Sequence, residues 1–589
     1  MSNEQIAKIL RNIATAYTIK NEKQFRFQII AYQRAADFIK NSSIELQDYY
    51  KEGKLQDIPG IGASIKGHLE ELFETGKSKQ FIWALKGIPE PVFVLIDIPT
   101  FGPKKSYRLI NEFGLSNSIN VIADLEKIAK KGLIARVEGF GEKSQKDILR
   151  AIKEFRERKG KTSRMTLPFA SEISDKIIAY LRKSSYVVSA YVLGSLRRQL
   201  PTVGDIDIAV ASNHPKEVID HFIAYPHIER VIEKGKETAS MLVSGGKQID
   251  LMVQPPQAFG ALLQHFTGSK NHNIALREFA LKRNMSLSEH GIKYLKSKKS
   301  SIQKIDSEEK FYKTLGLAWI PPEIRDNTGE IELAAKNALP KLIEIKDIKG
   351  DFHIHSNFPI EPSHDLGKNT IEEMTNKAIS LGYEYLGFSE HNPSISKHTV
   401  GKISSLIEAR NKLIDQILSN TKSVRILKLL EIDILPSGEL AVDNKSLNLL
   451  DFAIVSIHSV FNMDKEKMTQ RVIKGLSHSK AKILAHPTGR LLNERPGYEL
   501  DWNKILNFCK ENNKALEINA WPSRLDLSDQ LIRQCVDSNV KMAIDTDSHA
   551  LDQMENMKYG VAMARRGWAT KNDILNALEY NDLINWIRR

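Results

Sequence analysis

The last third of the chain contains a series of short apolar runs, each followed by a side chain of a type that binds metal ions. The runs are YLGFS, ILKLL, FAIVSI, KILA and KMAI, and the related stretch DFHIHS opens the region. Short apolar strands that alternate with amphipathic helices are typical of a β/α barrel or a doubly wound sheet. In a barrel, the carboxyl ends of the strands meet on one face. The polar residues at these ends would therefore converge.

These residues form a candidate metal-binding set. They are His353, His355, Glu390, His391, Glu431, His458, His486 and the stretch from Asp545 to His549. A polar residue after one strand is unremarkable, but six successive strands that end in His, Glu or Asp are hard to explain by core packing. A His/Asp/Glu set without cysteine suits manganese, zinc or iron. We expect a polynuclear metal site rather than scattered structural histidines.

A second constellation surrounds the stretch GDIDIAV at 204–210. Because residues i and i+2 of a strand share a face, Asp205 and Asp207 project together, while Ile206 and Ile208 point to the other side. Two carboxylates this close repel each other unless a dication binds them, and such oxygen ligands suit magnesium or manganese. The alternative is a solvated strand edge at an ordinary Gly-Asp turn.

The neighbouring segments favour the metal site. Gly194 and Ser195 end a strand-like run, where backbone amides and a hydroxyl can hold a triphosphate, and Arg198 can neutralise it. Gly204 allows a tight turn into the aspartate strand, and Asp250 in KQIDLMV adds a third carboxylate. Three carboxylates beside a phosphate-binding loop are the minimum for two-metal nucleotidyl transfer.

Charge and composition restrict the partners and the compartment. The formal charge of +13 points to a polyanion such as nucleic acid, although excess lysine is also compatible with a solvated surface. The two cysteines, Cys509 and Cys535, exclude a disulfide framework and a thiolate zinc finger and fit a reducing interior. No secretion signal or membrane-spanning run is present. We expect a cytoplasmic protein that has no membrane partner.

The first 160 residues show helical periodicity and three similar glycine-containing turns. The turns are DIPGIGASI (57–65), DIPTFGPKK (97–105), in which Thr100 stands where a first glycine is normal, and VEGFGEKS (137–144). Each would expose backbone N–H groups at the start of a helix, where a phosphate oxygen binds without any base being read. A single copy would be read as an ordinary helix connection. The expected DNA-binding residues are Gly60, Gly62, Gly102, Lys104, Gly139 and Gly141.

These turns resemble helix-hairpin-helix motifs, and GSLRR, GDIDI, IDLMV and FTGSKNHN (266–273) resemble motifs of family X DNA polymerases over residues 1 to about 325. The resemblance implies that Asp205 and Asp207 bind both metals, and that Asp250 completes the catalytic one and is the base for the primer 3′-hydroxyl. His265 stands where well-studied members carry a tyrosine. The implied nucleotide-binding residues are Gly194, Ser195, Arg198, Gly204, Phe266, Gly268 and Asn273.

The strand-end signatures, including DFHIHS, EHN, LLEIDIL, ILAHP and LEINAWPSRLDL, resemble the PHP (polymerase and histidinol phosphatase) domain from about 348 to 589. The resemblance implies a distorted β/α barrel and manganese-dependent phosphodiester hydrolysis. The implied ligands are His353, His355, His391, Glu431, His458, His486, Asp547 and His549. A longer loop from Asn357 to Gly367 replaces the usual short S-D-G, so Asp365 is the expected ninth ligand and His364 its rival.

The resulting fold class is multidomain α+β: a helical helix-hairpin-helix region, a nucleotidyltransferase palm with a mixed sheet, and a C-terminal distorted β/α barrel. The expected domains are an N-terminal helical domain (1–85), a fingers-like domain (86–160), the palm (161–255), a thumb-like domain that binds the nascent base pair (256–325), a linker (326–347) and the PHP domain (348–589).

The expected function is that of a repair polymerase that fills short gaps. It would use gapped or primer–template DNA and deoxynucleoside triphosphates, with Mg²⁺ or Mn²⁺ at the polymerase site and a Mn²⁺ or Zn²⁺ cluster in the barrel, and act as a monomer. The barrel would be a 3′-to-5′ exonuclease, with cleavage at abasic sites and 3′-phosphate removal as further activities. The alternatives are a nucleotidyltransferase on RNA or protein, and a DNA-binding scaffold with an inactive barrel.

One expected absence concerns 5′-deoxyribose-phosphate removal. Lyases of this family attack the open sugar with a lysine in the helix after the first hairpin motif, forming a Schiff base. That place falls on His68, and Lys66 lies about 200° around the helix from it. We expect little or no lyase activity.

Overall fold

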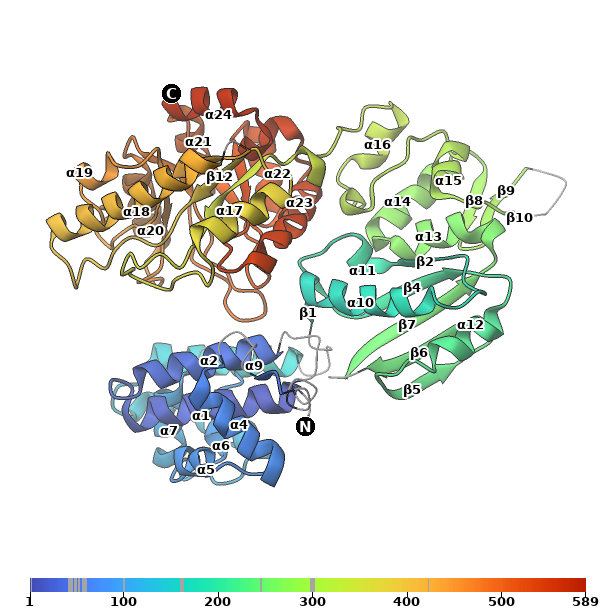
Figure 1. Ribbon diagram of the computed structural model, residues 1–589. Helices are drawn as coiled ribbons and strands as arrows, with labels where there is room; N and C mark the ends of the chain where they lie inside the picture. Colours follow the sequence, from blue (N-terminus) through green and yellow to red (C-terminus); the bar gives the residue numbers. More distant parts are fainter. Residues whose placement is uncertain are drawn as a thin grey trace. The chain divides into compact units, whose positions relative to one another are not determined.

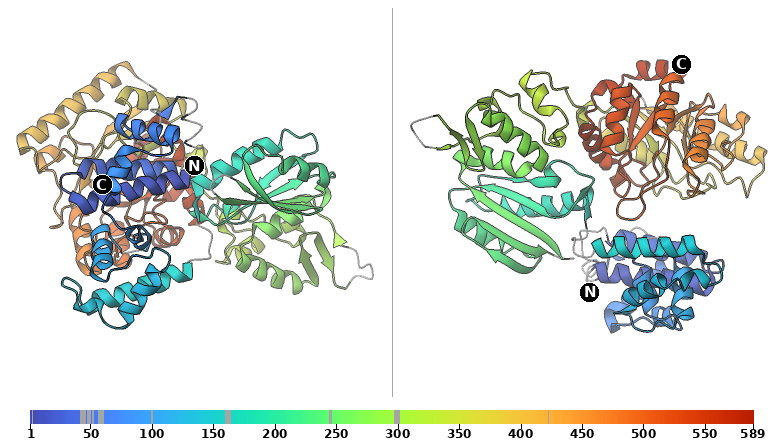
Figure 2. Two further views of the ribbon diagram at one scale, coloured as in Figure 1. Left: turned by 90° about the horizontal axis from the view of Figure 1, so that it is seen from below. Right: turned by 180° about the vertical axis from the view of Figure 1, so that it is seen from behind.

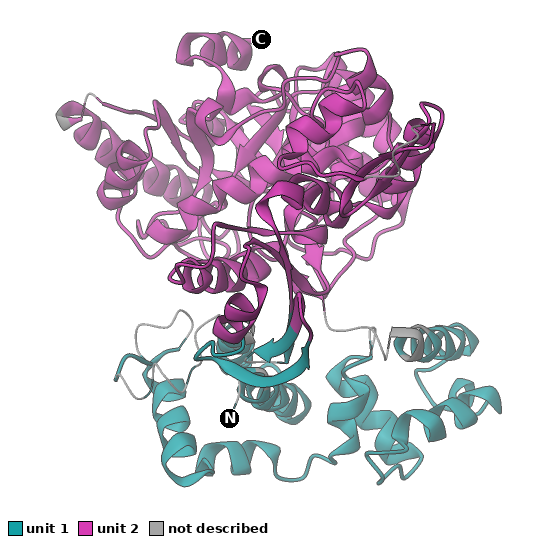
Figure 3. Ribbon diagram, turned by 90° about the vertical axis from the view of Figure 1, so that its right-hand side faces the viewer, with its two compact units in different colours: residues 1–163, 223–234, 240–249 teal, residues 164–222, 235–239, 250–589 magenta. Residues whose placement is uncertain are grey.

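The computed structural model describes residues 1–589 except 2, 41–45, 47–49, 51–52, 56–60, 99–100, 159–163, 244–245, 297–301 and 422. The chain divides into two compact units, coloured separately in Figure 3. The first comprises residues 1–163, 223–234 and 240–249, and the second comprises 164–222, 235–239 and 250–589.

The amino-terminal part of the first unit is helical. Its elements are α1 (Asn3–Asn21), α2 (Arg26–Lys40), α4 (Ala63–Thr75), α5 (Lys79–Leu85), α6 (Pro91–Leu95), α7 (Pro103–Glu112), α8 (Val121–Lys130), η2 (Ile134–Arg136) and α9 (Glu142–Arg158). Ile6, Leu10, Ile13 and Tyr17 of α1 recur every three or four residues, and all four are buried in the core that α1 shares with α2, α4 and α5. A second core joins helices α6 to α9.

The palm region follows. Its elements are β1 (Met165–Thr166), α10 (Leu167–Leu181), β2 (Ser189–Val192), α11 (Gly194–Arg197), β3 (Thr202–Val203), β4 (Ile206–Ala211), α12 (Pro215–Phe222), β5 (Ile228–Lys234), β6 (Thr238–Val243) and β7 (Lys247–Gln254). The five-stranded sheet has the order β2-β4-β7-β6-β5. Strand β4 runs antiparallel to β2, with Val192 opposite Ile208. Ile206, Ile208 and Val210 are fully buried, so the apolar face predicted for this strand lies in the core.

A small helical region with one sheet precedes the barrel. Its elements are η3 (Pro256–Ala258), α13 (Phe259–Thr267), α14 (Lys270–Leu281), β8 (Met285–Ser288), β9 (Gly291–Tyr294), β10 (Ile302–Gln303), α15 (Glu308–Thr314), η4 (Pro322–Ile324), α16 (Glu330–Ala335) and η5 (Ile345–Asp347). Its core surrounds Leu276, Phe311 and Tyr312 and also includes Trp568 from the far end of the chain.

The carboxy-terminal region alternates strands with helices. The strands are β11 (Gly350–Ile354), β12 (Tyr385–Phe388), β13 (Arg425–Lys428), β14 (Glu431–Asp433), β15 (Ala453–Ser456), β16 (Ala481–Leu484), β17 (Ala515–Asn519) and β18 (Met542–Asp545). The helices are α17 (Ile371–Ser380), α18 (Val400–Asn420), α19 (Asn444–Leu447), α20 (Lys465–Leu476), α21 (Trp502–Glu511), α22 (Asp529–Ser538), α23 (Met557–Arg566) and α24 (Tyr580–Arg588). Further 3-10 turns are η6 (Leu551–Asn556), η7 (Lys571–Asp573) and η8 (Leu575–Ala577).

These strands form a distorted closed barrel. All pairs from β11 to β13 and from β14 to β18 are parallel. Single parallel bridges between His391 and Glu431 and between Ile354 and Ser548 join the two sheets at both edges. Helices surround the strands, as the front and rear views show (Figures 1 and 2). The multidomain α+β class predicted from the sequence is confirmed. Within the described residues, no helix has both the length and the apolar character that crossing a membrane requires.

Candidate metal centres and nucleotide site

Three carboxylates lie together in the palm. Asp205 immediately precedes β4, Asp207 is on β4, and Asp250 is on the neighbouring strand β7. Burial, together with the negative charges of Asp205 and Asp250, raises the pKa of Asp207 to about 7. Mutual repulsion of this kind is what a bound dication relieves, and oxygen donors suit Mg²⁺ or Mn²⁺. The structure therefore brings the three predicted residues together, and their donor atoms fit these ions.

The loop between β2 and α11 packs against this cluster. Gly194 has a φ of 56°, and a Cβ at this position would lie 2.8 Å from Asp207 Oδ2. Both the backbone conformation and the lack of space require glycine here. Leu193 N–H also donates to the carbonyl oxygen of Asp207 at 2.8 Å. The predicted phosphate-binding turn, with Ser195 in the first turn of α11, is thus fixed directly beside the carboxylates.

The Arg198 side chain is largely enclosed. Its guanidinium donates to the carbonyl oxygen of Thr267, and its Nε lies 3.8 Å from Asp326 Oδ1. Burial, together with nearby Arg566 and Arg325, lowers the pKa of Arg198. Gly268 has a φ of 70°, and a Cβ there would lie 2.9 Å from Arg198 Nη1. The two segments that were predicted to bind nucleotide therefore contact each other.

The remaining nucleotide-site candidates lie on α13 and α14 or near β4. The Asn273 side chain accepts from Gln264 at 2.8 Å and donates to the carbonyl oxygen of His265 at 2.7 Å. Phe266 packs against the core beneath the palm sheet. Burial lowers the pKa of His265, so a neutral imidazole stands beside Phe266. Gly204 is partly exposed in the turn before β4.

Glu431 is the centre of the barrel cluster. Imidazole nitrogens of five histidines approach its carboxylate: His391 at 2.9 Å, His486 at 2.9 Å, His353 at 3.2 Å, His458 at 3.3 Å and His355 at 3.7 Å. Burial alone would raise the pKa of Glu431, but His391, His458 and His353 hold it well below its usual range. The five histidines lie at or just after the carboxyl ends of barrel strands, as predicted, whereas Glu431 follows β13 and is the first residue of β14.

Asp547 and His549 complete the cluster from the segment after β18. Asp547 Oδ1 lies 3.3 Å from His355 Nε2 and 3.5 Å from His353 Nε2. The His549 ring stacks on His355 with a centroid distance of 4.1 Å. The structure therefore gathers all eight predicted ligands in one place.

The donor set fits a group of metal ions. His353 Nε2, both ring nitrogens of His355, and His549 Nε2 are buried and have no hydrogen-bond partner among the described residues. Triads such as His353–His355–Glu431 and His355–His391–His549 have their ligand atoms within 4.8 Å of one another. Buried polar atoms are normally paired. Unpaired imidazole nitrogens that converge on a carboxylate are explained by metal coordination, and this set suits manganese, zinc or iron.

Two carboxylates that the sequence did not single out orient these ligands. Glu517 on β17 is fully buried, with Oε1 2.5 Å from His353 Nδ1, and it accepts from the backbone N–H of His486 at 2.6 Å. Asp433 Oδ1 lies 2.7 Å from His458 Nδ1. A carboxylate at the far nitrogen fixes the ring and directs the other nitrogen to the metal. Glu517 lies in the motif LEIN and Asp433 in the motif LLEIDIL. The alternation of side chains along these strands was the sequence signal that could have identified them.

The long loop after β11 brings both candidates for the ninth ligand to the cluster. Asp365 Oδ1 lies 3.5 Å from His391 Nε2, and its side chain is 41% exposed. His364 Nε2 lies 3.1 Å from Asp433 Oδ1. Asp365 thus places a carboxylate against the ligand His391. The His364 ring lies 4.9 Å from the His391 ring and 4.3 Å from the His458 ring, and its ligand atom groups with those of Asp433 and His458.

The hairpin turns of the first unit have the predicted helix starts. Gly62 and Gly102 immediately precede α4 and α7, and Gly141 precedes α9. Gly139 has a φ of 79°. Gly60 and Thr100 lie outside the described residues. Lys104 Nζ pairs with Glu22 Oε2 at 2.6 Å, an exposed contact that a phosphate would have to displace.

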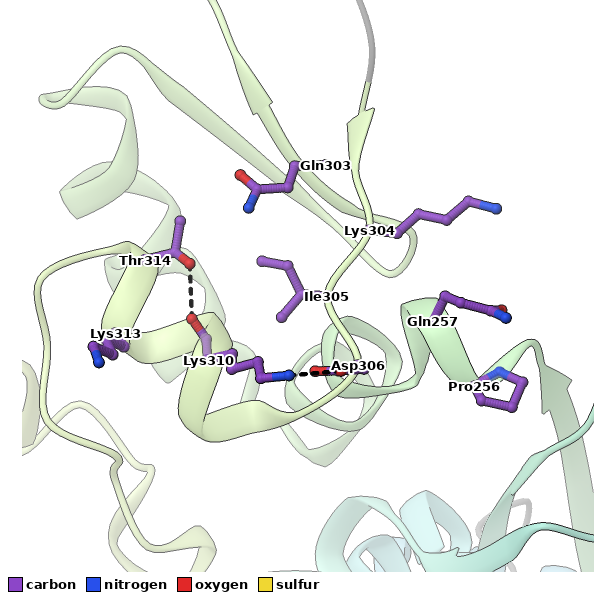
Figure 4. A pocket seen from close by; sticks show the side chains of 9 residues that line it. All are labelled: Pro256, Gln257, Gln303, Lys304, Ile305, Asp306, Lys310, Lys313 and Thr314. Carbon is purple, nitrogen blue, oxygen red and sulfur yellow. Dashed lines mark hydrogen bonds and ion pairs between the residues drawn. The ribbon is translucent and has the colours of Figure 1, made fainter.

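One surface pocket lies away from both clusters. It has a volume of about 650 Å³ and lies in the region of β10 and α15. Lys304 and Lys313 extend from opposite sides of it, and Lys310 pairs with Asp306 (Figure 4). Because the positive charges diverge, this pocket has no convergent ligand set.

Three family models match parts of this chain, and several known proteins are similar to it. Residues 1–78 match the helix-hairpin-helix domain, 262–326 the DNA polymerase beta thumb, and 351–520 the PHP domain. The DNA polymerase/3′-5′ exonuclease PolX of Bacillus subtilis is 32% identical over 592 residues, covering 100% of both chains. DNA polymerase lambda of Rattus norvegicus is 22% identical over 55% of this chain and 56% of its own length. A probable phosphatase of Acetivibrio thermocellus is 28% identical over 34% of this chain and 78% of its own.

Proposed function

Because the chain belongs to the family X DNA polymerases that carry a PHP domain, we propose that it fills short gaps in DNA and trims 3′ ends with its barrel. The observation that carries the proposal is the presence of two separate centres: the Asp205, Asp207 and Asp250 cluster beside a glycine loop, and the Glu431 cluster in the barrel. The proposed location is the cytoplasm, because two free, buried cysteines fit a reducing compartment. A monomer is expected, and sedimentation would check it.

In the palm, the residues of the chain bind the metal ions and the triphosphate, shape the nucleotide site and accept a proton. Mg²⁺ or Mn²⁺ held by Asp205, Asp207 and Asp250 would neutralise charge on the triphosphate and the attacking hydroxyl. Backbone amides at Gly194 and Ser195, with Arg198, hold the triphosphate, and Gly204, Phe266, Gly268 and Asn273 shape the nucleotide site. A carboxylate oxygen of Asp250 accepts the proton of the primer 3′-hydroxyl.

In the barrel, the proposed reaction is hydrolysis of the terminal phosphodiester of a DNA strand. A cluster of Mn²⁺ or Zn²⁺ ions held by the eight ligands and Asp365 would supply the Lewis acid. Glu517 and Asp433 fix the rings of His353 and His458, so the ligand nitrogens keep their direction. Cleavage at abasic sites and removal of 3′-phosphates use the same chemistry and are proposed as further activities.

The hairpin turns are proposed to hold the template backbone and the 5′ end of the gap. Backbone N–H groups after Gly60, Gly62, Gly102, Gly139 and Gly141, together with Lys104, would contact phosphates without sequence preference. Such binding weakens with rising salt.

One assay separates this proposal from its alternatives. Gapped DNA is incubated with Mg²⁺ or Mn²⁺, with and without nucleotides. Template-directed extension with nucleotides and 3′ shortening without them are expected. Addition to RNA or protein only would favour a nucleotidyltransferase on another substrate. Binding of DNA with neither reaction would favour a scaffold.

Little or no 5′-deoxyribose-phosphate lyase activity is expected. His68 is half-buried, and its Nδ1 lies 2.8 Å from the Tyr32 hydroxyl. Lys66 Nζ lies 3.8 Å from Glu70 Oε1. Burial lowers the pKa of His68, and an imidazole forms no Schiff base. Borohydride trapping on DNA with a 5′-deoxyribose phosphate is the measurement. An adduct that maps to residues 1–85 would contradict the prediction, and its loss in Lys66→Ala would identify the nucleophile.

Asp365→Ala is expected to lower metal content and slow the exonuclease by about 100-fold, a typical cost of weakening a metal site. The reason is that a carboxylate facing His391 offsets the charge of clustered dications. His364→Ala is the matched variant, and it should keep its metal because removal of this imidazole leaves the carboxylate of Asp365 in place beside His391. Metal analysis and exonuclease rates on single-stranded DNA check both. Metal loss in His364→Ala alone would reverse the assignment.

A further inference from the structure

Arg566, the last residue of α23 in the barrel, contacts the palm and the region before the barrel. Its Nη1 donates to the carbonyl oxygens of Arg198 at 2.9 Å and Glu323 at 3.2 Å. Its Nη2 donates to Asp326 Oδ2 at 2.9 Å and to the carboxylate of Asp529. The side chain is only 5% exposed, and charge-assisted hydrogen bonds of this kind are strong away from bulk water.

These contacts reach the proposed triphosphate loop at two points. Arg566 holds the backbone of Arg198 directly, and Asp326 lies between the two guanidinium groups, with Oδ1 3.8 Å from Arg198 Nε. The Arg198 guanidinium in turn bonds the carbonyl oxygen of Thr267, the residue before Gly268. A shift of Arg566 would therefore change both the position and the charge environment of Arg198.

Docking of the barrel does not depend on Arg566 alone. The preceding residue, Arg565, donates from Nε to Glu323 Oε1 at 2.7 Å and from Nη1 to the carbonyl oxygen of Ile343 at 2.9 Å. Trp568 packs into the core around Phe311. A buried arginine is costly to desolvate, and Arg566, unlike Arg565, has one of its acceptors in the nucleotide loop, the carbonyl oxygen of Arg198.

We propose that Arg566 is a positioning residue for nucleotide addition, through which the barrel fixes the triphosphate-binding loop of the palm. This inference rests on the proposed role of Arg198 in binding the triphosphate. It links the two halves of the enzyme by contact, although each keeps its own metal centre.

The test uses the full chain with gapped DNA and Mg²⁺. Arg566→Ala is expected to raise the KM for the deoxynucleoside triphosphate about 10-fold, the usual effect of losing a hydrogen bond to a charged group. The kcat and the KM for DNA should stay within about 3-fold of the wild-type values. A general loss of folded enzyme would instead lower the apparent kcat. Exonuclease activity in Mn²⁺ should be unchanged. Arg565→Ala is the matched control and should leave the nucleotide KM unaltered.

An unchanged nucleotide KM in Arg566→Ala would overturn the inference. An equal rise in Arg565→Ala would also overturn it, because loosened docking would then explain the effect. If Arg566→Ala does not fold, Asp326→Asn tests the same bridge from its other side, and an unchanged KM there counts against the proposal. Arg198→Ala separates the premises: no effect of that variant refutes the nucleotide-site assignment, whereas an effect there without one in Arg566→Ala refutes only the role of Arg566.

Discussion

Asp250→Ala loses nucleotide addition by at least about 10³-fold, or about 4 kcal/mol of transition-state stabilisation, while the barrel hydrolyses DNA at its original rate. The reason is that Asp250 belongs to a carboxylate cluster whose charges already interact, as the raised pKa of Asp207 shows. Removing one carboxylate removes both a metal ligand and the proposed base. Primer extension and exonuclease assays on one preparation are the measurement, and Asp207→Ala should behave in the same way.

The reciprocal variant completes this prediction. His353 is fully buried in the barrel between Glu431, Asp547 and Glu517, so His353→Ala should abolish hydrolysis and leave nucleotide addition intact. Asp250→Asn is the matched control for packing, because it keeps the shape of the side chain and removes its charge. Loss of both activities from one folded single variant would contradict independent centres.

The parts that the sequence predicted depend on local periodicity. Alternation in GDIDIAV placed Ile206 and Ile208 in the core and Asp207 on the other side. In the barrel, the end of each apolar run was enough to find His391, Glu431 and His486. Both inferences need only the strand repeat and the rule that parallel strands end on one face.

The parts that the sequence did not predict depend on contacts between distant segments. Glu517 lies inside an apolar run, and its side chain faces His353 only because of the register of β17 in the barrel. The pairing of Lys104 with Glu22, which is 82 residues away, has no signal in the local sequence. In the sequence, Arg566 is an ordinary cation at the end of a helix. Only the structure shows that it contacts the backbone of Arg198. Register and docking are decided by tertiary packing.

Glu431→Gln is expected to eliminate metal binding in the barrel and to lower the exonuclease rate by at least about 10³-fold, with nucleotide addition retained. Five histidines approach this one carboxylate, and it belongs to two triads of candidate ligands, one with His353 and His355 and one with His391 and His458. An amide keeps the size of the side chain but offers one neutral oxygen. Asp547 already faces His353 and His355, so it does not replace the lost charge.

A measurement independent of activity tests the same prediction. Ligands that bind only the folded state stabilise it, so chelation should lower the melting temperature of the wild-type barrel. The melting temperature of Glu431→Gln should not respond to chelator. Glu466→Gln, a change of an exposed carboxylate on α20 that pairs with Lys504, should respond like the wild type. A Glu431→Gln protein that still holds its metals and shortens DNA would show that Glu431 is a charge partner of the histidines and not a metal ligand. If the wild type itself holds fewer than two metals and leaves single-stranded DNA intact in Mn²⁺, the barrel is a scaffold.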